Sequence, residues 1–402
     1  MVVSEGLSLL LELPRLYSMA PHPSVNNCQE LPLPLPEPDK DRRLRVLSLP
    51  GRNFKGNAYF RLFCDGLDAA GLKVVDRRIL DALRLRFDII HVHFPEHYVT
   101  EHNLGTAITL SFIYMSLFLA AKARRRCIVW SIHDVLPFKR RHLWLLKPFM
   151  RLFHSLVDGH VFLNPSSQRE FYKNFPSAEV KPFSLIAHGP YPVNEPTAAA
   201  LQARRRAFVG EENAFVVGVL GNIKRYKNIG ALKWCPKRLS NGRPVRIVVA
   251  GKKDAECGGE VEEALAQIES NRLIHLDEQL SDSMLDELIR AVDVVFLSYE
   301  RGWSSGFAML VLSNRGRVLG SRLPVFTDLR ETFGAPWVYQ YATPSELQSI
   351  LNTIAETRPT TADEMRLAKM LNDMSFAVGA QTLKTFYEEL TQRLKCCITY
   401  YQ

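Results

Sequence analysis

The sequence predicts an α/β protein with two doubly wound parallel sheets in tandem. At 402 residues the chain is too long for one ordinary core, so two domains are expected. Short apolar runs typical of buried strands alternate with helix-length segments in two series. A polar stretch rich in Ala and Arg, 194–212, separates the series and indicates an interdomain connection. We expect ligands between the domains, at the carboxyl ends of the strands.

The first series predicts a domain over residues 43–195. Strands are expected in RLRVLSLP, LKVVDRR, FDIIHVHFPE, RCIVWSIHD, GHVFLN and PFSLIAHG, and NAYFRLFCDGLDAAG has the apolar spacing of a helix. Residues 1–42 contain a proline-rich segment over 21–40 and are expected to form a partly disordered appendage.

The second series predicts a domain over residues 210–372. Its expected strands are AFVVGVLGNI, VRIVVAGK, RLIHLDEQL, DVVFLSY and a closing LPVFTD, and Ser281 or Asp282 is expected to cap a helix. Residues 373–395 have apolar residues at i, i+3 and i+4, which predicts a helical segment that packs back on the first domain.

Charge and cysteine content narrow the function classes. The net charge of +9 and the pI of about 9.2 favour an acidic partner: nucleic acid, an anionic membrane or a phosphorylated substrate. No basic recognition helix or aromatic stacking module is visible, which argues against nucleic acid. Seven scattered cysteines without C-x-x-C spacing indicate neither a zinc site nor a disulfide framework, and favour a reducing cytosol.

Two turns in the second domain have the composition of phosphate-binding loops. The first follows the opening strand and combines a permissive glycine with three cations: Gly221, Lys224, Arg225 and Lys227. The second, weaker candidate is Gly251 with Lys252. A solvated basic loop is the alternative interpretation.

A third turn, Trp303-Ser304-Ser305-Gly306, separates an apolar strand from an apolar helix. Unpaired N–H groups and the helix dipole make such a helix N-terminus suited to an anion. The alternative is that the serines only cap and line the helix.

Polar residues of the first domain also follow predicted strands, where sites on such sheets lie. Glu96 follows one strand, His133 and Asp134 follow the next, and His188 closes the domain. His91 and His93 alternate along their strand and share one face, although buried histidines are usually structural.

Several of these motifs resemble known ones. G-x-I-x-x-Y-K-N at 221–228, A-G-K at 250–252 and V-D-V-V-F-x-S-Y at 292–299 look like the nucleotide-sugar half of GT-B glycosyltransferases. FDIIHVHFPEHY, VWSIHDVLPF and IAHGPYP are similar to stretches of bacterial exopolysaccharide glycosyltransferases, both succinoglycan-type glucosyltransferases and xanthan-type β-mannosyltransferases. The likeness spans residues 43–395 and implies two tandem Rossmann-like domains facing across a cleft, the first binding the acceptor and the second the nucleotide sugar.

The resemblance also implies a mechanism. Many retaining GT-B enzymes carry two glutamates eight positions apart, where this chain has Ser305 and Ser313, and this departure favours inversion and a β-linkage. The general base is then expected from Glu96, Asp134 or His133. Ser304, Ser305 and Gly306 would hold the diphosphate, while His93 and His188 would contact phosphate or acceptor.

No Asp-x-Asp follows a predicted strand, so we expect no metal and no cofactor. Lys224, Arg225, Lys227 and Arg301 would instead meet the leaving-group charge. The resemblance implies a reaction that adds one hexose to a polyprenyl-diphosphate-linked oligosaccharide in exopolysaccharide synthesis. On the resemblance alone, UDP-glucose is the first expected donor and GDP-mannose the second. A catalytically silent binding subunit and a retaining transferase remain as alternatives.

Two segments bear on membrane contact. Residues 104–121 contain no charge but fall between two strands of one predicted sheet, so we expect a packed helix rather than a membrane span. Residues 122–151 contain nine Lys and Arg and one acidic residue, interleaved with aromatic and apolar residues. This pattern predicts peripheral contact with anionic lipid at the inner face of the cell membrane, with an ordinary amphipathic helix as the alternative.

Overall fold

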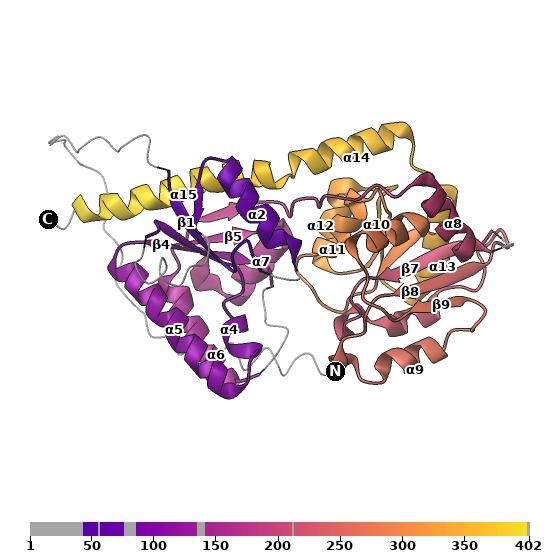
Figure 1. Ribbon diagram of the computed structural model, residues 1–402, viewed down its shortest axis with the longest axis horizontal. Coiled ribbons are helices and arrows are strands. Elements are labelled where there is room, and N and C mark those ends of the chain that lie inside the picture. The colour runs from indigo at the N-terminus through magenta and orange to yellow at the C-terminus, as the bar shows by residue number, and fades with distance from the viewer. Residues whose placement is uncertain (1–42, 55–56, 76–85, 135–140, 211–212, 400–402) are drawn as a thin grey trace.

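The computed structural model describes residues 43–399 except 55–56, 76–85, 135–140 and 211–212, and the side chains of 395–399 are not described. The predicted appendage, 1–42, lies outside the described residues. Two six-stranded parallel sheets, each covered by helices, lie side by side along the molecule (Figure 1). Their strand orders are β2-β1-β3-β4-β5-β6 and β12-β11-β10-β7-β8-β9. This architecture confirms the predicted fold class.

All six strands predicted for the first sheet are present. They are β1 (Arg45–Leu49), β2 (Lys73–Val75), β3 (Ile89–Val92), β4 (Cys127–Ile132), β5 (Gly159–Phe162) and β6 (Phe183–Leu185). The connecting helices are α2 (Ala58–Ala69), α4 (His97–Thr100), α5 (Leu104–Ala123), α6 (Leu143–Leu156) and α7 (Pro165–Asn174). The central strands are buried on both faces, which explains why they appear as continuous apolar runs.

The second sheet contains four of its five predicted strands. Its strands are β7 (Phe215–Leu220), β8 (Val245–Ala250), β9 (Leu273–Leu276), β10 (Val294–Leu297), β11 (Val318–Ser321) and β12 (Val338–Tyr341). Its helices are α8 (Ala198–Val209), α9 (Glu260–Ala266), α10 (Asp282–Ala291), α11 (Gly306–Ser313), α12 (Pro324–Phe333) and α13 (Leu347–Glu356). Ser281 is the N-cap of α10, because its side chain accepts from the Met284 N–H.

The predicted closing strand LPVFTD is wrong. Those residues begin α12, with Pro324 in the first turn, where a missing N–H costs nothing. The strand in this part of the chain is β11, and the edge strand β12 was not anticipated. In the connecting stretch 194–212, residues Ala198–Val209 form the helix α8, which packs against α10 and β7 of the second domain.

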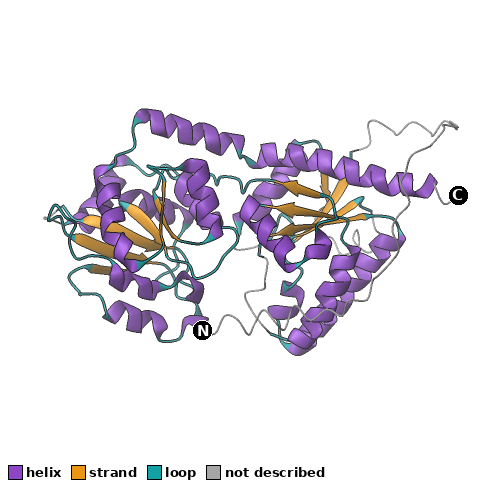
Figure 2. Cartoon of the chain, turned by 180° about the vertical axis from the view of Figure 1, so that it is seen from behind, coloured by secondary structure: helices purple, strands orange, loops and turns teal. Residues whose placement is uncertain are grey.

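The chain returns to the first domain through α14 (Thr361–Asp373) and α15 (Phe376–Thr399), which run along one side of both domains (Figures 1 and 2). α15 packs against α2 so closely that a Cβ on Gly66 would lie 2.8 Å from the Phe376 carbonyl oxygen. Deeper along α15, the fully buried Tyr387 hydroxyl contacts the ring of His91 in β3. The last helix is therefore part of the first domain's core.

Candidate active site

The serine turn after β10 lies at the interface of the two domains. Ser304 Oγ donates to the backbone carbonyl of His133 (3.2 Å), and Asn164 Nδ2 donates to the carbonyl of Trp303 (2.5 Å). The Trp303 side chain packs against the apolar core of the first domain. The turn is thus held at the carboxyl ends of β4 and β5.

The hydroxyls of the turn are engaged within the protein. Ser305 is the N-cap of α11, since its Oγ accepts from the Ala308 N–H (3.1 Å). Ser313 Oγ donates to the Met309 carbonyl and accepts from the N–H of Tyr191, which anchors the interdomain connection. The groups left to face an anion are the backbone N–H groups at the start of α11, because the first turn of a helix has no internal acceptors for them.

The two glycine turns of the second domain lie against each other. Gly251 has a φ of +140°, and a Cβ there would lie 2.2 Å from the Gly221 carbonyl oxygen, so only glycine fits. Gly221 has a φ of +75°, and a Cβ there would lie 3.2 Å from the ring of Phe307 at the start of α11. The structure therefore brings both predicted glycine turns to the N-terminus of this helix.

The predicted cations separate into different environments. Lys227 is 6% exposed; its Nζ donates to the Leu220 carbonyl (3.0 Å) and lies 4.9 Å from the centre of the Phe307 ring. Burial, aided by the neighbouring Lys224, lowers the pKa of Lys227 to about 7. Within the described part of the chain no carboxylate pairs with it. A buried amine beside a helix N-terminus is suited to bind an anion.

The other cations lie nearer the surface. Lys224 and Lys252 are exposed, and Arg225 pairs with Glu260 of α9 (2.8 Å), both largely exposed. The charge of Arg225 is therefore directed to Glu260 and does not add to the buried cation at Lys227. Lys224 and Arg301 lie close enough to Asp134 of the first domain to act on its ionisation.

Two carboxyl groups of the first domain lie near this interface, the buried Glu96 and the less enclosed Asp134, and Asp134 is the one that lies near these cations. Burial raises the pKa of Asp134 to about 7, although Arg301 and Lys224 oppose the rise. Burial raises the pKa of Glu96 to about 8, with the charge of Asp134 adding to the effect. Two carboxyl groups with elevated and unequal pKa values are a common feature of acid–base sites.

The predicted histidines form a buried network behind this pair. His93 Nδ1 lies 3.0 Å from His133 Nε2, and His91 Nε2 lies 2.6 Å from Ser131 Oγ. Burial holds the pKa values of all three histidines below the ordinary value, so they are neutral at pH 7. His93 is 1% exposed and stands behind His133, which suits a positioning role rather than ligand contact.

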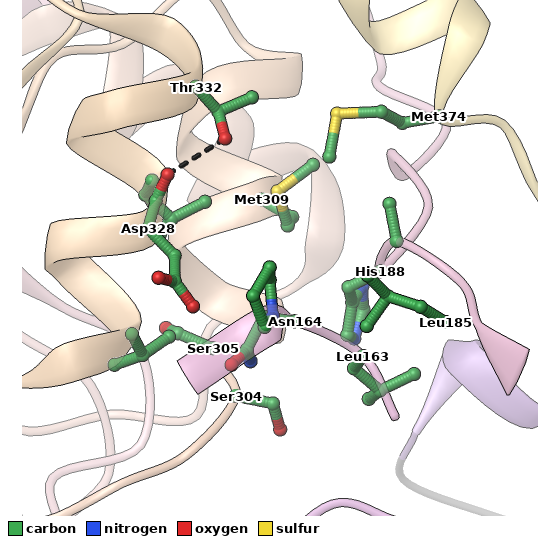
Figure 3. Close-up of a pocket in the computed structure, with 14 residues that line it drawn as sticks. Leu163, Asn164, Leu185, His188, Ser304, Ser305, Met309, Asp328, Thr332 and Met374 are labelled. Atoms are coloured by element: carbon green, nitrogen blue, oxygen red, sulfur yellow. Dashed lines mark hydrogen bonds between the residues drawn. The ribbon is translucent and has the colours of Figure 1, made fainter. Parts of the chain in front are cut away.

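A cavity of about 220 Å³ opens beside the serine turn, between the domains (Figure 3). His188 and Asn164 line it from the first domain, and Ser304, Ser305 and Met309 line it from the second. A Cβ on Gly306 would lie 3.1 Å from His188 Nε2, which places that histidine against the start of α11. Neither Glu96 nor Asp134 lines the cavity, so it adjoins the carboxyl pair without containing it.

One interdomain contact was not predicted. Asp328 of α12, 8% exposed, accepts from the Ser166 N–H (2.9 Å) and from Ser166 Oγ (2.6 Å) at the start of α7. Arg169, on the same helix, lies 3.6 Å from the carboxylate. The sequence NPSS signals the start of α7, but Asp328 was expected at the end of a strand, so nothing in the sequence pairs the two residues.

Among the described residues, no cluster of three or more His, Cys, Asp or Glu is placed to hold a metal ion.

Two facing parallel sheets whose carboxyl ends meet at one interface define the GT-B fold. In sequence, the chain is similar to the GDP-mannose:glycolipid 4-β-D-mannosyltransferase of Xanthomonas campestris pv. campestris. The identity is 23% over 305 residues, which cover 74% of this chain and 80% of that protein. No protein-family model matches the chain.

Solved structures show the same fold at lower identity. Anabaena Alr3699/HepE in complex with UDP and glucose superposes with a TM-score of 0.55 at 17% identity, covering 89% of this chain and 100% of that one. A glycosyltransferase from Rickettsia africae ESF-5 superposes with a TM-score of 0.58 at 12% identity, covering 87% and 98%. At these identities the likeness establishes the fold alone.

Proposed function

We propose that this protein is an inverting glycosyltransferase that moves one hexose from a nucleotide sugar to a lipid-linked oligosaccharide. The observation that carries the proposal is the position of Asp134 of the first domain, which lies close to Lys224 and Arg301 of the second domain and next to the turn that opens the N-terminus of α11. An acceptor hydroxyl needs a base, and a departing diphosphate needs positive charge, on opposite sides of one carbon.

Asp134 is the general base in this proposal. It lies close enough to Lys224 and Arg301 of the second domain for their charges to act on it, and the carbonyl of its neighbour His133 accepts a hydrogen bond from Ser304. Glu96 instead interacts with Asp134 and Glu101 of its own domain, so we place Asp134 before Glu96. His133 is neutral but hydrogen-bonded to His93, and it fits better as support for the neighbouring aspartate.

In the reaction, the Asp134 carboxylate takes the proton of the acceptor hydroxyl as its oxygen bonds to the anomeric carbon. The bond from that carbon to the diphosphate breaks, and the diphosphate keeps the electron pair. Lys227, Lys224 and the first N–H groups of α11 meet the negative charge. Displacement from the opposite face turns an α-linked donor into a β-linked product.

The donor and acceptor are proposed from the relatives. The relative reported above is a GDP-mannose:glycolipid 4-β-D-mannosyltransferase, and its glycolipid acceptor and β-linkage are those of the reaction proposed here. We therefore propose GDP-mannose as the first candidate donor, ahead of UDP-glucose, which the sequence motifs favoured and which a structural neighbour binds. A polyprenyl-diphosphate-linked oligosaccharide of exopolysaccharide synthesis is the proposed acceptor.

The donor is tested by thermal shift with UDP, GDP, UDP-glucose and GDP-mannose, with and without EDTA. A ligand that binds the native state raises the unfolding midpoint. A rise with guanine ligands alone supports GDP-mannose, and a rise with uridine ligands alone supports UDP-glucose. Loss of the rise on adding EDTA would contradict metal-independent binding, and no rise with any nucleotide would favour a silent binding subunit.

The base is tested by Asp134→Asn, with Glu101→Gln at the exposed end of α4 as control. We expect Asp134→Asn to lower kcat by about 100-fold or more while the donor-induced thermal shift remains. Loss of activity in Glu96→Gln alone would move the base to Glu96. An α-linked product by NMR would contradict inversion and favour the retaining alternative.

A further inference from the structure

α5 presents an unusual face to solvent. It is the one helix of the described chain that is long and apolar enough to cross a membrane, yet only 28% of its apolar window is buried. The residues that pack on the domain form a narrow stripe along it: Ala107, Ser111, Tyr114, Phe118 and Ala121. Through this stripe α5, which connects β3 to β4 in the chain, packs along the first domain and contacts β4 and α6.

The exposed side of α5 lacks the charges of a solvent-facing helix. Leu104, Ile108, Phe112, Ile113 and Leu119 are 42–74% exposed, and the helix carries no charge before Lys122. Helices that face water normally carry charged residues on that side. A contiguous exposed apolar surface on a domain marks a site of contact with a membrane or with another protein.

α6 extends this surface. His142 Nε2 lies 3.2 Å from the His102 carbonyl, so α5 and α6 begin side by side, and both views show them together at the outer edge of the first domain (Figures 1 and 2). Leu143, Trp144 and Leu152 of α6 are 41–63% exposed. We define the α5–α6 surface as these three residues together with the five exposed apolar residues of α5.

The charge around the α5–α6 surface is positive. Neither helix contains Asp or Glu, and the exposed cations at their ends and sides are Arg124, Arg125, Arg141 and Arg151. Glu101 is the one exposed carboxylate among the described residues from 97 to 157. A second copy packed on the same surface would bring these arginines together without acidic partners, whereas anionic lipid complements them.

We propose that the α5–α6 surface docks on an anionic lipid bilayer, with both helices lying in the interface and their apolar side chains among the acyl chains. Such helices bind by burying apolar area while basic residues contact the headgroups. The sequence alone pointed to residues 122–151; the structure adds α5 as the main apolar contact. A cytoplasmic protein would thereby rest on the inner face of the cell membrane.

The α5–α6 surface also lies near the two carboxyl groups of the candidate site. The short helix α4 joins Glu96 to the start of α5, and Asp134 lies between β4 and α6, so both carboxyl groups are at the end where the two helices begin. A lipid-linked acceptor held in the bilayer would present its sugar at this end. The inference deepens the proposed function and rests on it in this respect alone.

The test is flotation of the full chain with vesicles of phosphatidylcholine, with and without phosphatidylglycerol. Neither donor nor acceptor is present, so failure here is distinguishable from failure of the proposed activity. We expect binding to the phosphatidylglycerol vesicles that weakens as salt is raised. The double variant Phe112→Ser, Ile113→Ser should lower the partition coefficient by about tenfold or more, because two apolar side chains are lost from the interface.

Matched controls come from the second domain. Met365, 71% exposed on α14, is replaced in Met365→Ser, which should bind vesicles as the unchanged protein does. Arg124→Gln with Arg151→Gln should reduce binding to anionic vesicles, and Lys369→Gln should not. An unchanged midpoint of urea unfolding verifies the fold of each variant.

Three results would overturn the proposal: no vesicle binding by the unchanged protein, equal losses in Met365→Ser and the double variant, or binding that ignores phosphatidylglycerol. A dimer that the double variant converts to a monomer, without vesicle binding, would assign the surface to a second copy instead.

Discussion

The contact between Asp328 and Ser166 allows a quantitative test of how the domains are held together. The carboxylate accepts two hydrogen bonds from one residue of the other domain, at 2.9 and 2.6 Å, and is 8% exposed. In Asp328→Asn the side chain keeps one oxygen as an acceptor, but an NH2 group, which cannot accept, replaces the other oxygen. One charge-assisted hydrogen bond is therefore lost, which is worth about 1.5–3 kcal/mol. The Arg169 pair adds under about 1 kcal/mol, because Arg169 is mostly exposed.

The assay is a double-mutant cycle of Asp328→Asn and Ser166→Ala in urea unfolding. Fluorescence and circular dichroism must give coincident transitions before a free energy is taken from them. We expect a coupling energy of about 1–2 kcal/mol, since both changes remove the same bond. Additivity within about 0.5 kcal/mol would refute the contact.

Asp363→Asn is the matched control. Asp363 also accepts from one residue's N–H and hydroxyl, those of Thr360, but it does so at the exposed cap of α14 within one helix. Its loss should cost about 1 kcal/mol and show no coupling to Ser166→Ala.

Three further predictions follow from buried groups. Because burial raises the pKa of Asp134 to about 7 and lowers that of Lys227 to about 7, kcat/KM should rise toward pH 7 as Asp134 ionises and fall above it as Lys227 loses its proton; a flat profile from pH 6 to 8 would contradict both roles. Gly251→Ala should lower the unfolding free energy by about 2 kcal/mol or more and weaken donor binding, as its Cβ meets the Gly221 carbonyl; unchanged urea midpoints would argue against that turn. The ring of His160 is buried, and neither of its nitrogens has a hydrogen-bond partner among the described residues. Burial lowers its pKa from 6.5 to about 3, so the unfolded chain takes up a proton first and stability declines as pH drops below 6.5. His160→Leu should therefore stabilise the protein by about 1–2 kcal/mol and flatten the acid side of its stability profile, measured by urea unfolding from pH 7 to 4.5.

The alternation of strands and helices was predictable because buried parallel strands appear as short apolar runs that few other structures produce. The prediction was wrong at LPVFTD, where Val and Phe favour a strand but Pro324 suits the first turn of a helix. Local preferences could not decide between the two. The neighbouring β11 contains Gly320, which weakens its strand signal, yet the ring of Phe326 occupies the space that a side chain there would need.

The candidate site was only partly predictable, because a sequence shows which residues follow strands but not what they touch. Glu96, Asp134 and the glycine turns were identified from their positions alone. The engagement of Arg225 by Glu260, and the contact of Tyr387 with His91 nearly three hundred positions away, depend on packing that no local pattern records. The elevated pKa values likewise arise from burial, which no local sequence pattern records.

The serines of the turn have a physical explanation in this interface. Ser305 is 7% exposed and lies where the turn meets the strand end that carries His133 and Asp134. A glutamate there would add a third buried carboxyl group to a site in which burial already raises the pKa values of two. In the proposed reaction, a neutral cap would keep the helix N-terminus available to the diphosphate and leave Asp134 able to ionise. Because Ser304 is bonded to the carbonyl of His133, next to Asp134, separating the domains would remove the proposed base from the proposed anion site, so both halves of the proposed reaction depend on one closed interface.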